Sequence, residues 1–379
     1  MSANATITTT SRIASRPLAG VQVLEYGTGV GVGYCGALLA DLGADVVKIH
    51  APRDVPGEDA VLRTRAETLY LDSDKTTVHE SVGAEAFRSR FSSVDIVLRG
   101  YEPSDGAAPD LRREYESWGG GNADLIFVAV TPFGVTGPGS GWHGGDLNAQ
   151  GLSGWTSITG MPGEAPLSMS YGIGALQHGL NAAGATVAAL IERGHDQGGE
   201  FVDVSEADVI AACIRMYSLT YRFLGIPLKR NGLRAPGSSG RYPHTILPCK
   251  DGYISTICRS ETDWNRFLAM MGSPAWGDDP RYRDFFAMAT DYPDEVDDLI
   301  IPWLMEHTKD QLAELATTFK VPLAPVRTAD EVVREPQFEH RGFFRQRTLD
   351  GQEVIVPGRV AHWTVLDAGA VDPDGGHSV

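Results

Sequence analysis

The sequence predicts an α/β protein with a parallel sheet in its N-terminal part and a smaller α/β domain later in the chain. Two observations support the parallel sheet. A helix-like segment, Gly36–Leu42, follows the first of several short apolar runs, which gives the spacing of a βαβ unit. These runs have the length and composition of buried strands: Val21–Tyr26, Ala44–Ile49, Ser93–Leu98 and Ala123–Val130. The smaller domain is predicted because residues 247–325 combine one strand-like stretch with two helical stretches.

Composition narrows the classes of partner. The 379 residues carry a net charge of −17, which disfavours nucleic acid and anionic membranes as partners. No apolar run reaches the roughly 18 residues of a membrane span, and residues 1–16 lack the apolar core of a secretory signal. The four cysteines are widely spaced, which favours reduced thiols and a cytoplasmic location. An anionic ligand would therefore need a local basic patch.

The middle of the chain shows three kinds of segment. Leu176–Glu192 is rich in small residues, and Gly179 and Gly184 would allow another backbone to approach this predicted helix closely. A hairpin-like stretch at 198–205 and a helical stretch at 206–225 follow. Residues 226–246 are rich in Gly, Pro, Ser and Arg, and such a long irregular loop is typically functional or mobile.

A glycine-rich turn raises the question of a nucleotide. Residues 27–36 read GTGVGVGYCG and contain the pattern G-x-G-x-x-G at Gly31, Gly33 and Gly36. A dinucleotide site also needs an acidic residue at the end of the second strand, and that strand ends at His50. The missing acid disfavours a nicotinamide cofactor. The backbone N–H groups of the turn still suit a phosphate or another polar ligand.

Several stretches resemble one family in the same order along the chain. The segment PLAGVQVLEYGTGVGVGYCGALLADLGADVVKIHAP is similar to the amino terminus of family III CoA-transferases, which include formyl-CoA and carnitine-type CoA-transferases and α-methylacyl-CoA racemases. The resemblance continues through 133–166, 188–208, 248–272 and 321–344, and covers about residues 17–365. It implies a Rossmann-like large domain built from both chain ends, a small domain, and a dimer of two interlocked chains.

The resemblance also implies a domain layout. We expect flexible tails at both ends and a small domain inserted into the large one. The layout is a tail at 1–16, the large domain at 17–205, a linker with a glycine-rich lid at 206–246, the small domain at 247–325, a return to the large domain at 326–368, and a tail at 369–379.

In the family the glycine turn faces coenzyme A. The resemblance places Gly29, Val30 and Gly31 against CoA and no metal at the site. Arg53 and Lys75 become candidates for its phosphates, because guanidinium and ammonium groups pair with phosphate. Lys75 matches the lysine of the family pattern N-x-x-K-x-S, although Asp72 stands where the family has Asn. Without the resemblance, both cations would be read as ordinary solvated charges.

The family nucleophile is missing at its expected position. In these transferases an aspartate in the context G-D-x-x-x-G attacks the acyl-CoA thioester, and it forms a mixed anhydride and then an aspartyl-CoA thioester. The matching stretch reads Gly174-Ala175-Leu176-Gln177-His178-Gly179, so Ala175 occupies the aspartate position. No Asp occurs between Asp146 and Asp196, so a small register shift does not restore it. The chemistry must therefore differ from the standard route.

Five other residues are candidates for the remaining chemistry. His178 could act as a base near neutral pH, and Gln177 could hydrogen-bond a thioester carbonyl. The resemblance to racemases adds three more: His143, Asp146 and Glu261. Each has a structural alternative, His178 as a capping group and the other three as a polar network. The loop Ala235–Tyr242 matches the glycine-rich lid of the family, or else is a plain linker.

Three hypotheses about function stay open at this point. The chain is an acyl-CoA enzyme with altered chemistry, or a non-catalytic subunit that pairs with an Asp-containing paralogue. The third is a diverged or racemase-like enzyme that no longer uses CoA. A homodimer or a heterodimer is compatible with the first two.

Overall fold

The computed structural model divides the chain into two compact units. It describes residues 16–49, 68–79, 85–101, 110–119, 121–195, 198–234, 241–349, 352–358 and 360–361. The first unit contains the chain up to Asp146, Gly172–Val209 and the part from Pro336 onward. The second unit contains Leu147–Tyr171 and Ile210–Glu335. The first unit is thus built from both ends of the chain.

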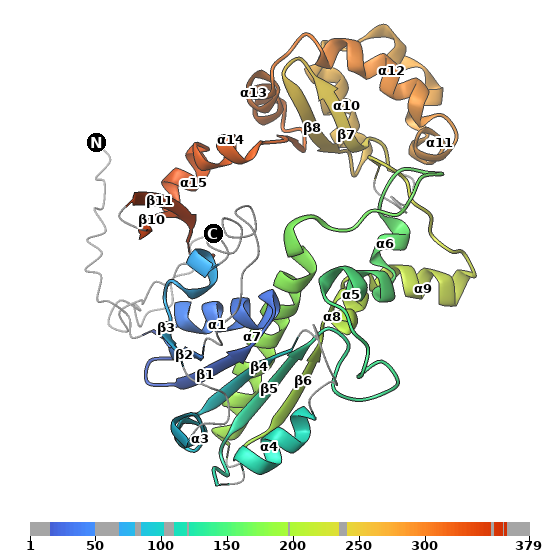
Figure 1. The fold of residues 1–379 in the computed structure, drawn as a ribbon. Coiled ribbons are helices and arrows are strands. Elements are labelled where there is room, and N and C mark those ends of the chain that lie inside the picture. Colours follow the sequence, from blue (N-terminus) through green and yellow to red (C-terminus); the bar gives the residue numbers. More distant parts are fainter. Residues whose placement is uncertain are drawn as a thin grey trace, which may run out of the picture. The chain divides into compact units, whose positions relative to one another are not determined.

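A parallel sheet forms the centre of the first unit (Figure 1). Its described strands lie in the order β3-β2-β1-β4-β5-β6, and every neighbouring pair runs parallel. The α/β prediction is confirmed. The strands are β1 (Gln22–Gly27), β2 (Asp45–Ile49), β3 (Thr76–Val78), β4 (Ile96–Gly100), β5 (Ile126–Thr131) and β6 (Phe201–Ser205).

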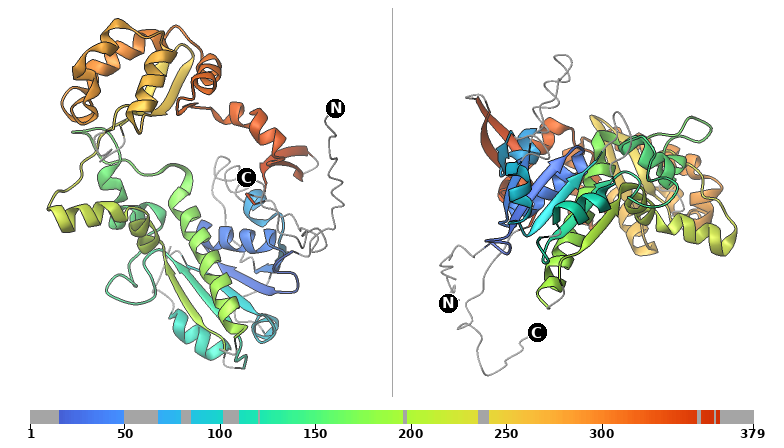
Figure 2. Two further views of the ribbon diagram at one scale, coloured as in Figure 1. Left: turned by 180° about the vertical axis from the view of Figure 1, so that it is seen from behind. Right: turned by 60° about the horizontal axis from the view of Figure 1, so that its bottom comes forward.

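Helices cover both faces of this sheet, which explains why its strands are apolar throughout. All six residues of β5 are buried. One face packs against α1 (Val30–Asp41) and α7 (Ile173–Arg193), and the other against α3 (Glu85–Phe91) and α4 (Leu111–Gly119) (Figure 1). The views in Figure 2 show α1 and α7 beside the same sheet. The rest of this unit includes α15 (Pro336–His340) and the hairpin of β10 (Phe344–Leu349) and β11 (Gln352–Pro357).

Two expectations about local structure are wrong. The stretch at 198–205 is not a hairpin, because Phe201–Ser205 pairs in parallel with β5 as a strand of the main sheet. The helix after β1 begins at Val30 and not at Gly36. Glycine disfavours helix interiors, which made this start hard to predict. Here Gly31 and Gly36 lie inside the helix where a Cβ atom would come within 2.8 Å of His178 and 1.9 Å of Glu25, and at Gly33 it would lie 3.2 Å from Leu71 Cδ1.

A buried ionic cluster lies beneath α1. Glu25 in β1 is 1% exposed, and its Oε2 accepts a hydrogen bond of 2.6 Å from Lys75 Nζ. Lys75 also donates to the Gly33 carbonyl oxygen at 2.8 Å and to Asp72 Oδ1 at 3.1 Å. A Cβ atom on Gly36 would lie 1.9 Å from Glu25 Oε2, so this glycine makes room for the carboxylate. Burial raises the pKa of Glu25, which Lys75 and Lys48 counteract.

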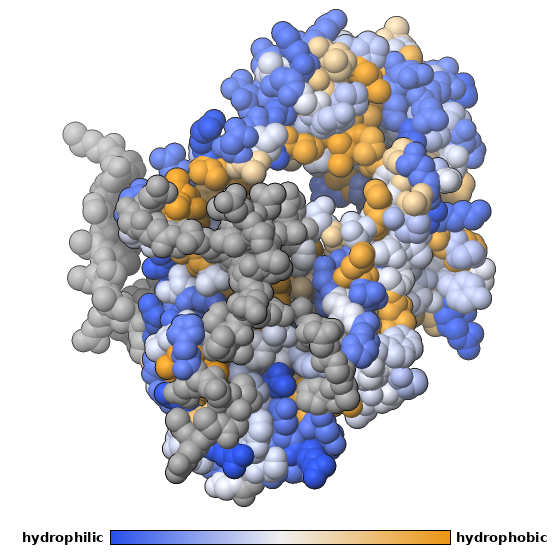
Figure 3. Space-filling view, in the orientation of Figure 1, coloured by the Kyte–Doolittle hydropathy of each residue, from blue (hydrophilic) through white to orange (hydrophobic). Residues whose placement is uncertain are grey.

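The second unit has its own core. A three-stranded antiparallel sheet in the order β7-β8-β9 packs with helices around Trp264 and Phe267. Apolar side chains also gather on its surface over β7 and β8 (Figure 3). The elements are α6 (Trp155–Ile158), α9 (Arg215–Leu224), β7 (His244–Cys249), β8 (Gly252–Ile257), α10 (Glu261–Met270), α11 (Phe285–Thr290), α12 (Pro293–Leu304), α13 (Lys309–Phe319), β9 (Leu323–Pro325) and α14 (Ala329–Val333). Two helices connect the units along the chain, α5 (Asp146–Ser153) and α8 (Glu206–Cys213).

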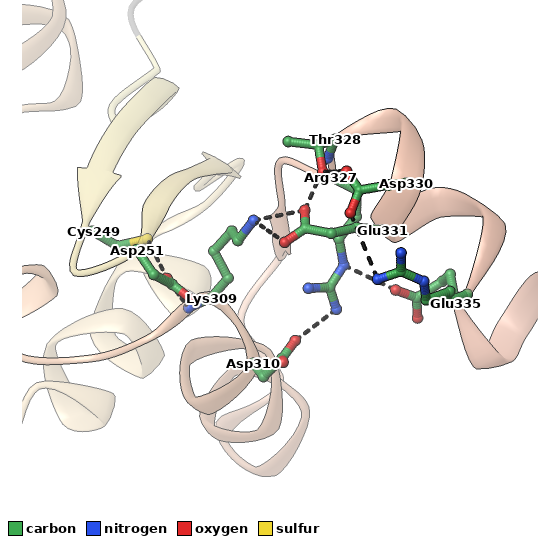
Figure 4. Close-up of polar contacts among 10 residues, drawn as sticks. Cys249, Asp251, Lys309, Asp310, Arg327, Thr328, Asp330, Glu331 and Glu335 are labelled. Carbon is green, nitrogen blue, oxygen red and sulfur yellow. Dashed lines mark hydrogen bonds and ion pairs between the residues drawn. The ribbon is translucent and has the colours of Figure 1, made fainter.

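A polar cluster around Lys309 ties together three parts of the second unit (Figure 4). The buried Lys309 ammonium binds both oxygens of Glu331 at 2.6 and 2.7 Å, and its backbone N–H donates to Asp251 Oδ1 at 2.8 Å. Arg327 adds ion pairs with Asp310 at 2.7 Å and Glu335 at 2.9 Å. These bonds join α13 to the β7–β8 turn and to α14. The more exposed ion pairs of Arg327 contribute little to the stability of the fold. The buried Lys309 ammonium, in contrast, needs the Glu331 carboxylate to offset the cost of burying its charge.

Neither a membrane-spanning helix nor a metal-binding cluster is present in the described residues. No helix in the described ranges combines the length and the apolar character needed to cross a bilayer. No three His, Cys, Asp or Glu side chains in these ranges gather closely enough to hold a metal ion.

We predict that Lys75→Met destabilises the protein strongly. The substitution removes the ammonium that is fully buried against Glu25 and leaves that carboxylate poorly compensated, at a cost of about 3–5 kcal/mol. Urea denaturation measures the loss. The control is Lys48→Met, since the Lys48 side chain is 18% exposed and lies 3.6 Å from Glu25 Oε1. Equal losses in the two variants would contradict the central role of the Lys75–Glu25 pair.

Candidate functional site

The candidate site lies at the carboxyl edge of the parallel sheet, where ligands bind in open α/β folds. Here β1 ends in the glycine turn, and α1 begins at Val30. Gly27 and Gly29 have φ angles of 104° and 117°, which other residues rarely adopt. A Cβ atom on Gly27 would lie 1.9 Å from the Gly100 carbonyl oxygen. Backbone geometry and the close approach of β4 therefore require these glycines, whatever the turn binds.

The first turns of α1 and α7 lie against each other. A Cβ atom on Gly31 would lie 2.8 Å from His178 Nδ1 and 3.3 Å from the Ala175 carbonyl oxygen. A Cβ atom on Gly179 would lie 2.4 Å from the Gly31 carbonyl oxygen. The two helices therefore touch through their backbones and begin at the same edge of the sheet. Their N-terminal N–H groups make this edge favourable for an anionic or oxyanionic group.

Asp146 contacts the first turn of α7. Its Oδ1 accepts a hydrogen bond of 3.1 Å from the backbone N–H of Ala175, and the Asp146 side chain is half-buried. Ala175 itself is buried at 3% exposure. The carboxylate of the first residue of α5 thus lies beside the position where the family resemblance implies a catalytic aspartate. The sequence had marked Asp146 as a candidate, but its contact with Ala175 could not be inferred from spacing.

His178 is buried behind this edge. It is 3% exposed, and its Nε2 lies 2.8 Å from the Val204 carbonyl oxygen. A carbonyl oxygen only accepts, so Nε2 carries the proton and the neutral ring leaves Nδ1 unprotonated. The nearest carboxylate oxygen, Glu206 Oε2, is 3.8 Å from Nδ1. Burial lowers the pKa of His178 to about 4, against the opposing effect of the Val204 bond. This environment supports the structural alternative for His178.

The other candidate catalytic residues lie in three different settings. Gln177 is half-buried on α7, and its backbone carbonyl oxygen accepts a hydrogen bond from the Asn181 side chain. His143 is exposed in the loop before α5. Glu261 begins α10 in the second unit, where it is 4.0 Å from Arg283. Of the five candidates, the structure brings Asp146, Gln177 and His178 to the first two turns of α7.

The candidate CoA-binding residues also lie in different parts of the structure. Gly29 caps α1, and Val30 and Gly31 are its first two residues; their contact with CoA stays a prediction. The three hydrogen bonds of the Lys75 ammonium all go to protein groups, so a phosphate contact would require it to give up one of them. Arg53, like His50, lies outside the described residues.

Asp297 binds the residue before the predicted lid, Arg234, and the last residue of that lid, Tyr242. Residues 235–240 of that loop lie outside the described ranges. Arg234, just before them, pairs with Asp297 Oδ2 and with Asp294. Tyr242, two residues after them, donates a hydrogen bond of 2.5 Å to Asp297 Oδ1. Sequence reasoning missed Asp297, since its partners lie 63 and 55 positions away and no local pattern marks it.

Comparisons with known proteins identify the family of this chain. The family model described as "CoA-transferase family III" matches residues 18–376, nearly the whole sequence. The chain belongs to CoA-transferase family III. The earlier resemblance is thereby confirmed, and the fold fits a family III CoA-transferase.

Alignments with named relatives extend over most of this family III chain. It is 27% identical over 358 residues to succinate–glutarate CoA-transferase of Agrobacterium fabrum, an alignment that covers 90% of this chain and 88% of that protein. It is 26% identical over 352 residues to the succinyl-CoA:(R)-benzylsuccinate CoA-transferase subunit BbsE of Thauera aromatica, covering 86% and 83%. A solved CAIB/BAIF family protein from Brucella suis matches with a TM-score of 0.76 and 25% identity, covering 92% and 93%.

We predict that His178 stays neutral across the physiological range in this family III chain. Its folded pKa of about 4 lies below the ordinary 6.5, so the unfolded state binds the proton first as pH falls. The stability due to neutral His178 is complete above pH 6.5 and is lost as pH falls toward 4. The total loss is roughly 3 kcal/mol.

Denaturation at several pH values measures how stability depends on pH, and NMR of the imidazole carbons measures the pKa of His178. His178→Gln is the control, because it removes the titrating group and flattens the slope between these pH values. A His178 titration midpoint at or above 6.5 would show that the ring is available as a base and would contradict the structural role.

Proposed function

We propose that this protein handles an acyl-CoA thioester and transfers CoA between carboxylic acids by chemistry that differs from the standard family route. The observation that carries the proposal is the convergence of the α1 and α7 N-termini at the glycine turn, in a chain of family III. Backbone N–H groups at this edge would stabilise the oxyanion that forms when a thioester carbonyl is attacked. Gly29, Val30 and Gly31 would lie along the bound CoA.

The acyl group is proposed to be a small dicarboxylic acid. The support is indirect: the two named relatives above are named for succinate, glutarate, succinyl-CoA and benzylsuccinate. Ala175 is the reason for altered chemistry, because a methyl group cannot act as the nucleophile that the resemblance implies there. Four free cysteines accord with a reducing compartment, so we place the protein in the cytoplasm.

We predict that CoA and succinyl-CoA bind with dissociation constants on the order of micromolar, in the usual range for enzyme substrates. Isothermal titration calorimetry of the whole chain measures this, with NAD⁺ as the competing ligand class that should give no heat. Val30→Trp should weaken binding, because it adds bulk at the half-buried start of α1. Ile355→Trp is the matched control, at a 56% exposed position of β11. If neither CoA nor its thioesters bind, the proposal fails.

A second candidate function is that of a subunit whose partner carries the nucleophile. Three observations favour it. Ala175 lacks a reactive group, and the relative BbsE is named as a subunit. Helix α9 also presents large apolar side chains that no described residue covers, with Phe223 79% and Leu224 67% exposed. The partner would be a family III paralogue that keeps the aspartate, in the place that a second copy takes in a homodimer.

This candidate predicts that transferase activity requires co-expression with such a paralogue. The two chains should co-elute in size-exclusion chromatography with light scattering. Phe223→Asp should weaken their association at least tenfold without unfolding the chain, because the side chain is exposed. The control is Val360→Asp, at a 67% exposed site in the first unit. Full activity of the chain alone would rule this candidate out.

A further inference from the structure

The second unit contains a groove to which the proposed function gives no role. Its volume is about 590 Å³, which lies in the range of sites for small molecules. The lining comes from four short segments, 232–234, 244–246, 255–257 and 322–324, all of which belong to the second unit. The groove lies over β7, β8 and β9, and Figure 3 shows apolar surface over β7 and β8.

The floor of this groove is the face of the sheet that points away from the core of the second unit. His244 and Ile246 in β7, and Ser255 and Ile257 in β8, are half-buried, whereas the residues between them are buried. His244 pairs with Ile257, and Ile246 pairs with Ser255. The two polar side chains therefore lie on one diagonal of the ladder and the two isoleucines on the other. A single ligand on this floor meets both kinds of group.

The polar side chains of the floor can donate hydrogen bonds to a ligand. Ser255 Oγ donates to the Ala324 carbonyl oxygen at 3.4 Å, which is longer than an ordinary hydroxyl hydrogen bond, so a better acceptor can replace it. Burial and the nearby charge of Arg241 lower the pKa of His244, so the ring is neutral at pH 7 and carries one N–H. Both side chains can thus donate to one oxygen-bearing group.

The charge around the groove favours an anionic group. Among the described residues that line it there is no Asp or Glu, although the chain carries 49 acidic residues. Arg234 belongs to the lining, but Asp297 and Asp294 take up its charge. Arg241 is exposed, and its charge reaches His244. A carboxylate near His244 would therefore be attracted to Arg241.

We propose that this groove binds a carboxylic acid with an apolar body, of the medium-chain fatty acid class. The carboxylate lies between His244 and Ser255, on the side of Arg241. The apolar body lies against the two isoleucines of the floor and against Leu233, which is 54% exposed. The inference does not rest on the proposed function, because the groove belongs to the second unit and the candidate site to the first.

The size of the groove favours a small molecule over a protein partner. Stable interfaces between proteins engage about 20–30 residues of each partner. Twelve described residues line this groove. Apolar walls with a few polar groups at defined positions are also the usual composition of a small-molecule site.

Isothermal titration calorimetry of the whole chain with butanoate, hexanoate and octanoate tests the site. We expect octanoate to bind with a dissociation constant below about 1 mM. Each added methylene should tighten binding by about two- to fourfold, because it buries more apolar area. Octanamide keeps the chain but not the charge, so it should bind at least about fivefold more weakly. Equal affinities for butanoate and octanoate, or no heat with octanoate, would overturn the proposal.

Variants of exposed residues assign the binding to this groove. Leu233→Gln should weaken octanoate binding at least about threefold, because it removes apolar contact without disturbing the core. Tyr253→Gln is the matched control, since Tyr253 is 51% exposed on the same sheet, lies outside the lining and should bind octanoate as the wild type does. Arg241→Gln should weaken the binding of octanoate but not of octanamide.

Two further measurements separate this site from the alternatives. Light scattering of the Leu233→Gln variant reports on association between copies of the chain. A changed oligomeric state with unchanged octanoate binding would make the groove an interface between copies, and the proposal would be wrong. Calorimetry with CoA on the same samples tests the proposed function by itself, so that either conclusion can fail while the other stands.

Discussion

The contact between the backbones of α1 and α7 determines the geometry of the whole site. Gly31 and Gly179 let the two helices approach until a carbonyl oxygen stands where a side chain would otherwise lie. This approach puts both helix N-termini at one edge of the sheet and seals His178 beneath them. The polar features of the edge follow from it: the oriented N–H groups, the hydrogen bond to Asp146, and the neutral state of the buried imidazole. The packing of α1 against α7 thus requires small residues on both helices. The N–H groups that this packing brings together are then available to a ligand.

The fold was accessible from the sequence because its main signals are local. Buried parallel strands are short apolar runs, and Ile126–Thr131 is apolar except at its last residue. The start of α1 was not accessible, because three glycines argue against a helix unless their tertiary neighbours are known. The parallel pairing of Phe201–Ser205 with β5 was also hidden, since a strand's partner is a long-range property.

The sequence placed a candidate site at the glycine turn, but it did not reveal which groups the residues around that turn contact. The glycine turn at Gly29–Gly31 follows from a local pattern at a strand end. The environment of Lys75 does not, since its ammonium points into a cluster with Glu25, fifty positions away in the chain. A single acidic residue inside the apolar run VQVLEY was the available signal, because a buried carboxylate needs a cationic partner. The last glycine of the G-x-G-x-x-G pattern is explained by the same cluster. Gly36 has no side chain and so leaves room for the Glu25 carboxylate.

The hydrogen bond between Asp146 and Ala175 also has a consequence for the connectivity of the chain. The chain leaves the first unit at Asp146 and re-enters it at Gly172, which caps the N-terminus of α7. The bond therefore joins the two ends of the segment 147–171 and closes it into a loop. Closing a loop of this kind removes chain entropy once and holds its two ends together however the excursion moves. Asp146 and Gly172, the two ends of this excursion within the first unit, are thereby both held at the first turn of α7.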